Sequence, residues 1–198
     1  MNTDIVPPPS PWALFTEWYA LAQKNEPSYP DCMMLATVGD DGMPTARAVL
    51  MKDYDDKGIV FYTNRESRKG RELAAHGKAG LCFYWKSIQR QVRIEGDIEK
   101  TSDAESDAYF ATRPRGSQIG AWASQQSRPL DSRATLEARV CDLTARYEGR
   151  DVPRPLYWGG YRLVPRYFEF WQERDYRLHD RIAYTRDGAT WTIERMYP

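Results

Sequence analysis

The chain has 198 residues, and its 28 Lys and Arg balance its 28 Asp and Glu, so the formal net charge is zero. A neutral chain has no general attraction for the phosphates of a nucleic acid, so any anion must be bound by local basic clusters. The three cysteines, Cys32, Cys82 and Cys141, show no C-x-x-C spacing. Their odd number argues against a disulfide framework and fits a reducing compartment.

The composition argues against two further classes of protein. Because the chain has only two histidines, we expect no structural zinc site and no other metal. The N-terminus lacks a basic segment followed by an apolar run, and no uncharged stretch is long enough to span a membrane. We therefore expect a soluble cytoplasmic protein that binds neither nucleic acid nor membrane.

The chain begins with an arm and a helix. We expect residues 1–10, which include three consecutive prolines, to form a flexible arm, and residues 11–198 to form a single domain. The stretch "PSPWALFTEWYALAQ" predicts a helix, with Ser10 as its N-cap and Pro11 in its first turn. Its core-facing stripe consists of residues at helical spacing: Trp12, Phe15, Trp18, Tyr19 and Ala22.

The middle of the chain alternates β-forming runs with turns rich in Gly and Asp. We expect strands in "CMMLATV", "PTARAVLMKD", "IVFYTN", "AGLCFYW" and "RQVRIEGDIEK". Helices are predicted in "SRKGRELAAH", opened by Ser67, in "SDAESDAYFATR", capped by Ser102, and in "DSRATLEARVCDLTARYEG". The last helix carries one apolar stripe, made of Leu136, Val140, Leu143 and Tyr147.

The C-terminal part predicts four more strands, in "YWGGYRLV", "YFEFWQ", "RLHDRIAYTR" and "TWTIERMYP". In "RLHDR" the alternation of a strand places Arg177, His179 and Arg181 on one face. Short turns between consecutive strands predict antiparallel pairing, and so many strands favour a closed or partly closed barrel over an open sheet. The expected fold class is mainly β with peripheral helices.

Anion binding would have to rely on basic clusters, because the sequence contains none of the usual glycine-rich nucleotide loops or hydrolase motifs. Four clusters lie beside apolar and aromatic residues, at 47–52, 67–69, 113–128 and 177–181. The second coincides with a helix start, where backbone N–H groups already favour an anion.

Each cluster also has a simpler interpretation. Arg47 would then be a solvated strand side chain, Ser67 only an N-cap, 113–128 an exposed loop and His179 a structural histidine. Considered together, however, the clusters supply the roughly four cations that two phosphate monoesters in one site would need.

Long strings of the sequence resemble one family in order and spacing, over about 11–198. They are "FYTNRESRKG", "RQVRIEG", "YFATRPRGSQIGAWASQQS", "YWGGYRL", "EFWQERDYRLHDRIAY" and "ERMYP", and the family is the pyridoxamine 5′-phosphate oxidases. The resemblance implies an antiparallel FMN-binding split β-barrel, with a C-terminal dimerisation and substrate region inside the single domain. It also implies a homodimer with two active sites at the subunit interface.

The implied activity is FMN-dependent oxidation of pyridoxamine 5′-phosphate or pyridoxine 5′-phosphate to pyridoxal 5′-phosphate, with O2 reduced to H2O2. By position in these strings, the implied FMN contacts are Arg47, Lys52, Tyr62, Thr63, Arg68, Lys69, Gln91, Gln126, Ser127, Trp171 and Arg181. The implied substrate contacts are Lys52, Tyr109, Arg113, Ser117, Arg177 and His179, of which Arg177 and His179 are the expected catalytic pair.

The sequence departs from the family pattern at its N-terminus. Many members carry a basic and aromatic segment there that folds over the substrate, whereas "MNTDIVPPPS" contains no Arg or Lys. Two other functions stay open: an oxidase of the same barrel acting on a phenazine-pathway substrate, and a non-catalytic flavin- or pyridoxal-phosphate-binding module. The intact "RPRGSQIGAWAS", with Arg113 and Ser117, favours a phosphorylated substrate.

Overall fold

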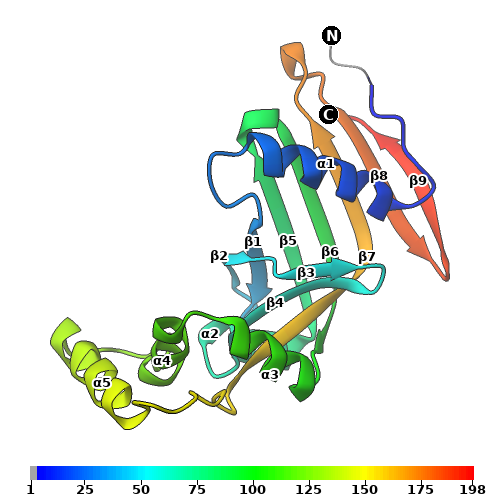
Figure 1. The fold of residues 1–198 in the computed structure, drawn as a ribbon. Coiled ribbons are helices and arrows are strands. Elements are labelled where there is room, and N and C mark those ends of the chain that lie inside the picture. Colours follow the sequence, from blue (N-terminus) through cyan, green and yellow to red (C-terminus); the bar gives the residue numbers. More distant parts are fainter. Residues whose placement is uncertain (1–3) are drawn as a thin grey trace.

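The computed structural model describes residues 4–198, in which one nine-stranded sheet is surrounded by five α-helices (Figure 1). The strands are β1 Cys32–Val38, β2 Pro44–Leu50, β3 Asp53–Asp55, β4 Gly58–Asn64, β5 Lys78–Trp85, β6 Arg90–Lys100, β7 Trp158–Gln172, β8 Asp180–Asp187 and β9 Thr190–Met196. The helices are α1 Pro11–Asn25, α2 Arg68–His76, α3 Asp103–Thr112, α4 Arg115–Ala123 and α5 Arg133–Arg146.

All strand pairs are antiparallel, and the long strand β7 organises the sheet. The order is β2-β1-β5-β6-β7-β4-β3, while β8 pairs with β7 and β9 with β8. On one edge β7 bonds to β6; on the other, its first half bonds to β4 and its second half to β8. The sheet curls into a half-barrel, so the predicted class, a mainly β split barrel with peripheral helices, is confirmed.

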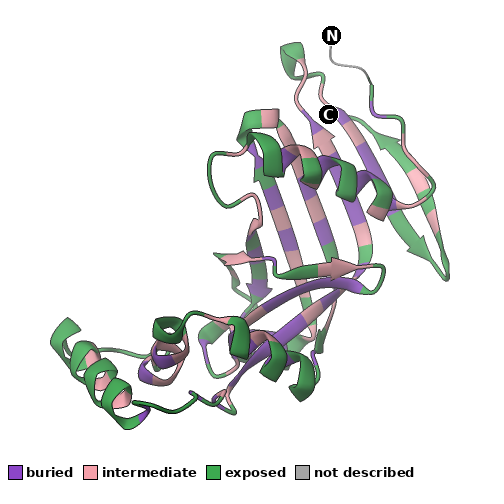
Figure 2. Cartoon of the chain, in the orientation of Figure 1, coloured by how far each residue is buried: buried purple, intermediate pink, exposed green. Residues whose placement is uncertain are grey.

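Helix α1 covers the concave face of the sheet and completes the core (Figure 1). Trp18 packs edge-on against Phe170 with ring centroids 5.3 Å apart, and Phe15 packs against Phe83 at 5.4 Å. All four side chains are buried, and Figure 2 shows the matching buried rows on the strands under the helix. Burial of each such aromatic side chain stabilises the folded protein by roughly 1.5–3 kcal/mol. The predicted apolar stripe of α1 is confirmed as part of the core.

Residues 4–10 of the expected flexible arm are packed against the C-terminal strands, while residues 1–3 lie outside the described part of the chain. Ile5 is buried, and its backbone N–H donates to Asp180 Oδ2 at 2.6 Å. The hydroxyl of Tyr184 donates to the carbonyl of Pro8 at 2.9 Å. From Asp4 onward the segment therefore makes specific contacts, which a flexible arm would lack.

The C-terminal part contains three strands rather than the four that we predicted. "YWGGYRLV" and "YFEFWQ" form one continuous strand, β7, although Pro165 lies between them. The pairing with β6 shifts register between Glu95 and Gly96, so that Arg166 is left without an opposite residue. This bulge lets the strand continue past a proline, which cannot donate to the ladder.

The prediction that "RLHDR" lies within a strand is wrong, because β8 begins only at Asp180. Residues Asp175–Arg177 form a 3-10 turn in which Tyr176 and Arg177 have φ of 57° and 62°, the left-handed region. A chain that turns in this way cannot alternate its side chains as a strand does. Arg177 and His179 therefore lie on the loop before β8, and only Arg181 lies on the strand.

The predicted helices are confirmed; Ser10 precedes α1 without a side-chain capping hydrogen bond, whereas Ser67 and Ser102 cap their helices. Ser67 accepts a hydrogen bond from the N–H of Gly70, and Ser102 forms a capping box with Glu105. The stripe of α5 is only partly buried: Tyr147 packs with α3 and α4, whereas Val140 is exposed. The segment 113–128, whose simpler interpretation was an exposed loop, contains helix α4. Among the described residues, no helix is long and apolar enough to cross a membrane.

We predict that Gly96→Ala destabilises the protein by about 1–3 kcal/mol. A Cβ at this position would overlap the backbone carbonyl of Val164, which β7 holds in place. The matched control is Gly80→Ala on β5, where a Cβ would meet only Ala36 Cβ at 3.9 Å and should be tolerated. Urea unfolding measures both changes, and an equal loss in the two variants would contradict the close approach at Gly96.

Candidate functional site

A cavity of about 850 Å³ opens between β2, β4, α3 and α4, within the usual size range of ligand pockets. Its lining includes these predicted site residues: Arg47, Lys52, Tyr62, Thr63, Lys69, Tyr109, Arg113, Ser117 and Gln126. Two arginines and two lysines face it, and its lining contains no carboxylate. We refer to it as the basic cavity, and its charge suits an anionic ligand.

Arg113 lines the basic cavity and packs against aromatic rings. Its guanidinium lies over the ring of Trp158 at 4.6 Å, against a wall where the rings of Tyr62 and Tyr109 stack at 4.1 Å. Burial lowers the pKa of Arg113. Its Nη1 is buried and has no hydrogen-bond partner among the described residues. A buried donor of this kind is costly unless satisfied, and Arg65 Nε and Arg90 Nη1, which do not line the cavity, are in the same state.

Lys69 and Gln126 line the cavity from different elements and contact each other. Gln126 Oε1 accepts hydrogen bonds from Lys69 Nζ at 3.2 Å and from Thr63 Oγ1 at 3.3 Å. Burial lowers the pKa of Lys69, and the nearby Arg47 lowers it further. Because two cations repel each other here, a bound anion would stabilise both.

Behind the basic cavity, Glu72 of α2 accepts hydrogen bonds from two arginines. Arg47 Nη2 lies 3.2 Å from Oε2, and Arg68 Nε lies 2.9 Å from Oε1. The hydroxyls of Thr37 and Thr45 also donate to Oε2, at 2.5 and 2.7 Å. Burial opposes ionisation of Glu72, but these hydrogen bonds outweigh it and lower the pKa of Glu72 to about 2.

A second group of predicted residues lies in one row across the sheet. Gln91 of β6 pairs with Trp171 of β7, which pairs with Arg181 of β8. His179 lies beside this row, with its ring 4.6 Å from that of Trp171. The backbone N–H of Arg174 donates to His179 Nδ1 at 3.2 Å. A neutral His179 therefore carries its proton on Nε2, which is then able to donate to a ligand.

Arg181 is already paired in this row. Its Nη2 lies 2.9 Å from Glu169 Oε2, and its Nη1 donates to the carbonyl of Tyr197 at 2.8 Å. The hydrogen bonds to Glu169 raise the pKa of Arg181. Arg181 therefore keeps its charge but has only part of its guanidinium left for a cofactor.

The two groups of residues lie far apart within one chain. Tyr62 is opposite Gly160 on β7, and Trp171 is eleven residues further along the same strand. At about 3.3 Å per residue this separation is roughly 35 Å along the strand. Trp171, Arg177 and His179 therefore do not line the basic cavity of their own chain.

Four further residues lie next to the basic cavity or support the residues that line it. Arg68 and Ser127 do not line the basic cavity but adjoin residues that do, Lys69 and Gln126. Trp158, which supports Arg113, received no role from the sequence, although it lies within the string "YWGGYRL". Glu72 also received none, although its i, i+4 spacing from Arg68 is a signal for an ion pair.

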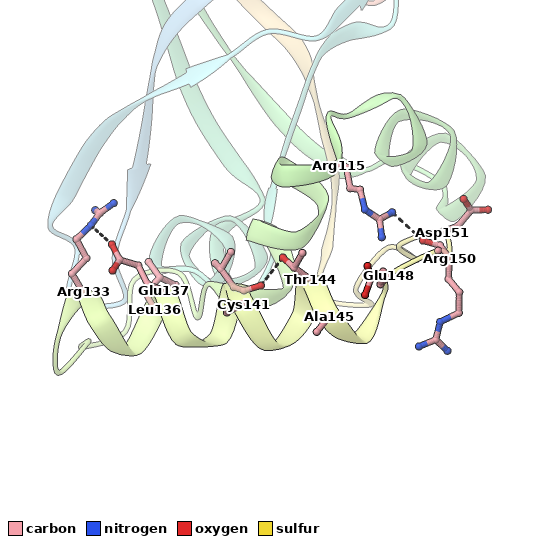
Figure 3. A pocket seen from close by; sticks show the side chains of 12 residues that line it. Arg115, Arg133, Leu136, Glu137, Cys141, Thr144, Ala145, Glu148, Arg150 and Asp151 are labelled. Carbon is pink, nitrogen blue, oxygen red and sulfur yellow. Dashed lines mark hydrogen bonds and ion pairs between the residues drawn. The ribbon is translucent and has the colours of Figure 1, made fainter.

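Another hollow, the α5 groove, runs along helix α5 and contains none of the predicted site residues (Figure 3). The arginines that line it are engaged locally. Arg133 pairs with Glu137 at 2.7 Å, and Arg115 donates to the carbonyl of Arg150 at 2.9 Å. The groove therefore offers little free charge to an anion. The part of the chain that the structure describes also contains no group of three or more His, Cys, Asp or Glu that could hold a metal.

Two curated proteins similar to this chain share a name. A chain from Brucella canis, named pyridoxine/pyridoxamine 5′-phosphate oxidase, is 54% identical over 199 residues, which cover 100% of this chain and 98% of that protein. A Brucella suis protein of the same name matches with the same identity and coverage.

Solved structures agree with this similarity. PhzG from Burkholderia lata, solved with tetrahydrophenazine-1-carboxylic acid, has a TM-score of 0.91 at 35% identity, covering 97% of this chain and 94% of that one. A pyridoxamine 5′-phosphate oxidase-related, FMN-binding protein from Nostoc punctiforme has a TM-score of 0.75 at 17% identity, covering 96% and 98%. At that identity the second likeness shows the fold alone.

Two family models match successive parts of the chain. Residues 22–146 match the model described as pyridoxamine 5′-phosphate oxidase. Residues 158–198 match the pyridoxine 5′-phosphate oxidase C-terminal dimerisation region. Together with the 54% identity to the Brucella enzymes, these matches show that the chain is an oxidoreductase and belongs to the pyridoxamine 5′-phosphate oxidase family.

Proposed function

We propose that this enzyme oxidises pyridoxamine 5′-phosphate or pyridoxine 5′-phosphate to pyridoxal 5′-phosphate, with FMN as cofactor and O2 as electron acceptor. The observation that carries the proposal is the basic cavity, which has four cations and no carboxylate in its lining. FMN and either substrate each bring one phosphate, and two phosphates need about that many cations. The names of the relatives support the same substrates.

The residues around the basic cavity fit FMN. Arg47, Lys69 and the neighbouring Arg68 form a cationic cluster at the N-terminus of α2, where the helix dipole also favours a phosphate. Thr63 and Gln126 add polar groups beside this cluster. We assign the cluster to the FMN phosphate. Lys52 and Tyr62 would contact the cofactor from the strand side of the cavity.

The other end of the cavity fits the substrate phosphate. Arg113 presents an unsatisfied buried donor, and Tyr109 and Ser117 line the same wall. Lys52 also lines the cavity, paired at 3.0 Å with Asp31. Binding the phosphate here would use energy from a remote part of the substrate to orient its C4′ carbon.

When bound, FMN would supply the redox chemistry, removing two electrons and a proton from C4′ and passing the electrons to O2. For the amine substrate, water and O2 are consumed, and the aldehyde, ammonium and H2O2 are released. The protein contributes binding and orientation. Arg177 and His179 would hold the pyridine ring on the side opposite the phosphate, and His179 would donate from Nε2. We assign His179 no general-base role.

The separation of roughly 35 Å along β7 supports a homodimer with shared sites. We propose that the basic cavity of one subunit faces the row of Gln91, Trp171 and Arg181, with Arg177 and His179, of its partner. A two-fold axis would create two such sites. The C-terminal residues 158–198, which match a dimerisation region, contain most of this second group.

A phenazine-pathway oxidation is the second candidate, because the PhzG structure is 35% identical and has a TM-score of 0.91. The ligand named there is a carboxylic acid rather than a phosphate ester. The buried, unsatisfied Arg113 and the four cations of the basic cavity favour the more highly charged phosphate.

We expect the purified, FMN-loaded protein to release H2O2 when pyridoxamine 5′-phosphate or pyridoxine 5′-phosphate is added, as a peroxidase-coupled assay measures. A protein that binds no FMN would refute the assignment of a flavin cofactor. A yellow protein without peroxide release would indicate a binding module. Faster turnover of tetrahydrophenazine-1-carboxylic acid, the ligand named in the PhzG structure, would favour the second candidate.

We expect Arg177→Ala and His179→Ala to lower kcat/KM for pyridoxamine 5′-phosphate by about tenfold or more each, since the first removes a charge-assisted contact and the second a hydrogen-bond donor. FMN content, measured by absorbance, should stay at the wild-type level. Leu178→Ala is the matched control, because its exposed side chain lies between the two on the same loop. Unchanged kcat/KM in both variants would refute their roles.

The shared site predicts complementation between inactive variants. Arg113→Ala and His179→Ala are each expected to be nearly inactive, but co-expressed subunits should recover about a quarter of wild-type activity. Half of the dimers in a statistical mixture are mixed, and in each of these one site has both defects while the other is intact. A mixture no more active than its components would show that both residues act within one subunit.

A further inference from the structure

Glu72 lies behind the basic cavity and is not one of the residues assigned to FMN or to the substrate. It comes from the middle of α2, its side chain is only 6% exposed, and it does not line the cavity. Burying a carboxylate is unfavourable unless its oxygens are fully bonded. Two arginines and two threonines bond this one, so its environment is built around a permanent negative charge.

The geometry at Arg68 shows what this charge does. Glu72 Oε1 accepts from Nε of Arg68 at 2.9 Å, and the side chain of Arg68 is 58% exposed. The bond to Nε fixes the plane of the guanidinium but uses neither of its two terminal amino groups. These two groups form the fork that binds phosphate oxygens bidentately.

Arg47 is held by the same carboxylate from another element. Its Nη2 donates to Glu72 Oε2 at 3.2 Å and to Thr45 Oγ1 at 2.5 Å. Its Nη1 donates to the hydroxyl of Thr37, which in turn donates to Glu72. One carboxylate thus ties α2 to β1 and β2 and sets the positions of two cations that would otherwise repel each other.

We propose that Glu72 is a positioning residue for flavin phosphate recognition: it orients Arg68 so that its two free terminal amino groups bind the FMN phosphate, and it holds Arg47, whose own terminal groups are engaged, as a fixed positive charge beside them. This inference rests on the proposed FMN function and adds a residue that itself touches no ligand. Two opposite effects are possible in principle. As a negative charge near a phosphate, Glu72 would weaken binding; as an anchor for two arginines, it strengthens binding. The four hydrogen bonds and the burial of Glu72 favour the anchor.

The test compares FMN with riboflavin, which has the same ring system but no phosphate. Dissociation constants for the apoprotein follow from quenching of flavin fluorescence. We expect wild type to prefer FMN, and Glu72→Gln to weaken FMN binding about tenfold or more while riboflavin binding stays unchanged. A general loss of structure would weaken both ligands equally, so an unchanged preference for FMN overturns the proposal. Tighter FMN binding by the variant would also overturn it.

A double-mutant cycle tests whether Glu72 affects FMN binding through Arg68. If Glu72 acts through Arg68, Glu72→Gln should weaken FMN binding much less in an Arg68→Ala background than in wild type. If the two substitutions weaken FMN binding additively, Glu72 does not act through Arg68. The matched control is Asp97→Asn, which also removes a carboxylate bonded to two cations, Lys78 and Arg166, away from the cavity. It should leave the preference for FMN at the wild-type value.

If Glu72→Gln does not fold, Glu72→Asp replaces it. This variant keeps the charge, but the shorter side chain cannot reach both arginines, so we expect the preference for FMN to fall. Retention of the wild-type preference would overturn the proposal. A wild-type protein that binds neither flavin would instead refute the proposed FMN function, so the two failures are distinguishable.

Discussion

The continuity of β7 is the constraint on which the rest of the structure depends. This fifteen-residue strand pairs with β6 from Tyr161 to its end, with β4 through its first half and with β8 through its second half. Its first half therefore carries the wall of the basic cavity, including Trp158, and its end carries Trp171. A rigid strand keeps these two ends apart, so neither end can complete the site of the other within one subunit. Dimerisation would then be part of forming the active site, rather than an addition to a complete one.

The electrostatics of the basic cavity follow from this arrangement. Four cations gather where no carboxylate lines the surface, and one of them, Arg113, leaves a buried donor unsatisfied. Such a group is unfavourable in the protein alone, and bound phosphates would relieve it. Glu72 supplies the negative charge from behind, where it orients the arginines without occupying the place of a ligand.

Family membership and detailed activity rest on different observations. The 54% identity to the Brucella oxidases and the two family models establish the family. The choice of substrate depends on local chemistry, because the PhzG structure shares the fold at 35% identity. Here the residues that favour a phosphate ester, above all Arg113 with its support by Trp158, carry more weight than overall likeness.

The sequence by itself determined most of the helices and strands, the caps at Ser67 and Ser102 and the core stripe of α1, because these depend on local spacing and residue type, but it predicted no helix at α4. It predicted nine of the residues that line the basic cavity. Only the tertiary structure decided that Pro165 lies within one long strand and that Arg177 and His179 lie on a turn. The anchor at Glu72 also depends on side chains from three elements meeting. Register shifts, left-handed turns and contacts between side chains of different elements depend on how distant segments pair. The hydrophobic periodicity of a sequence does not encode that pairing.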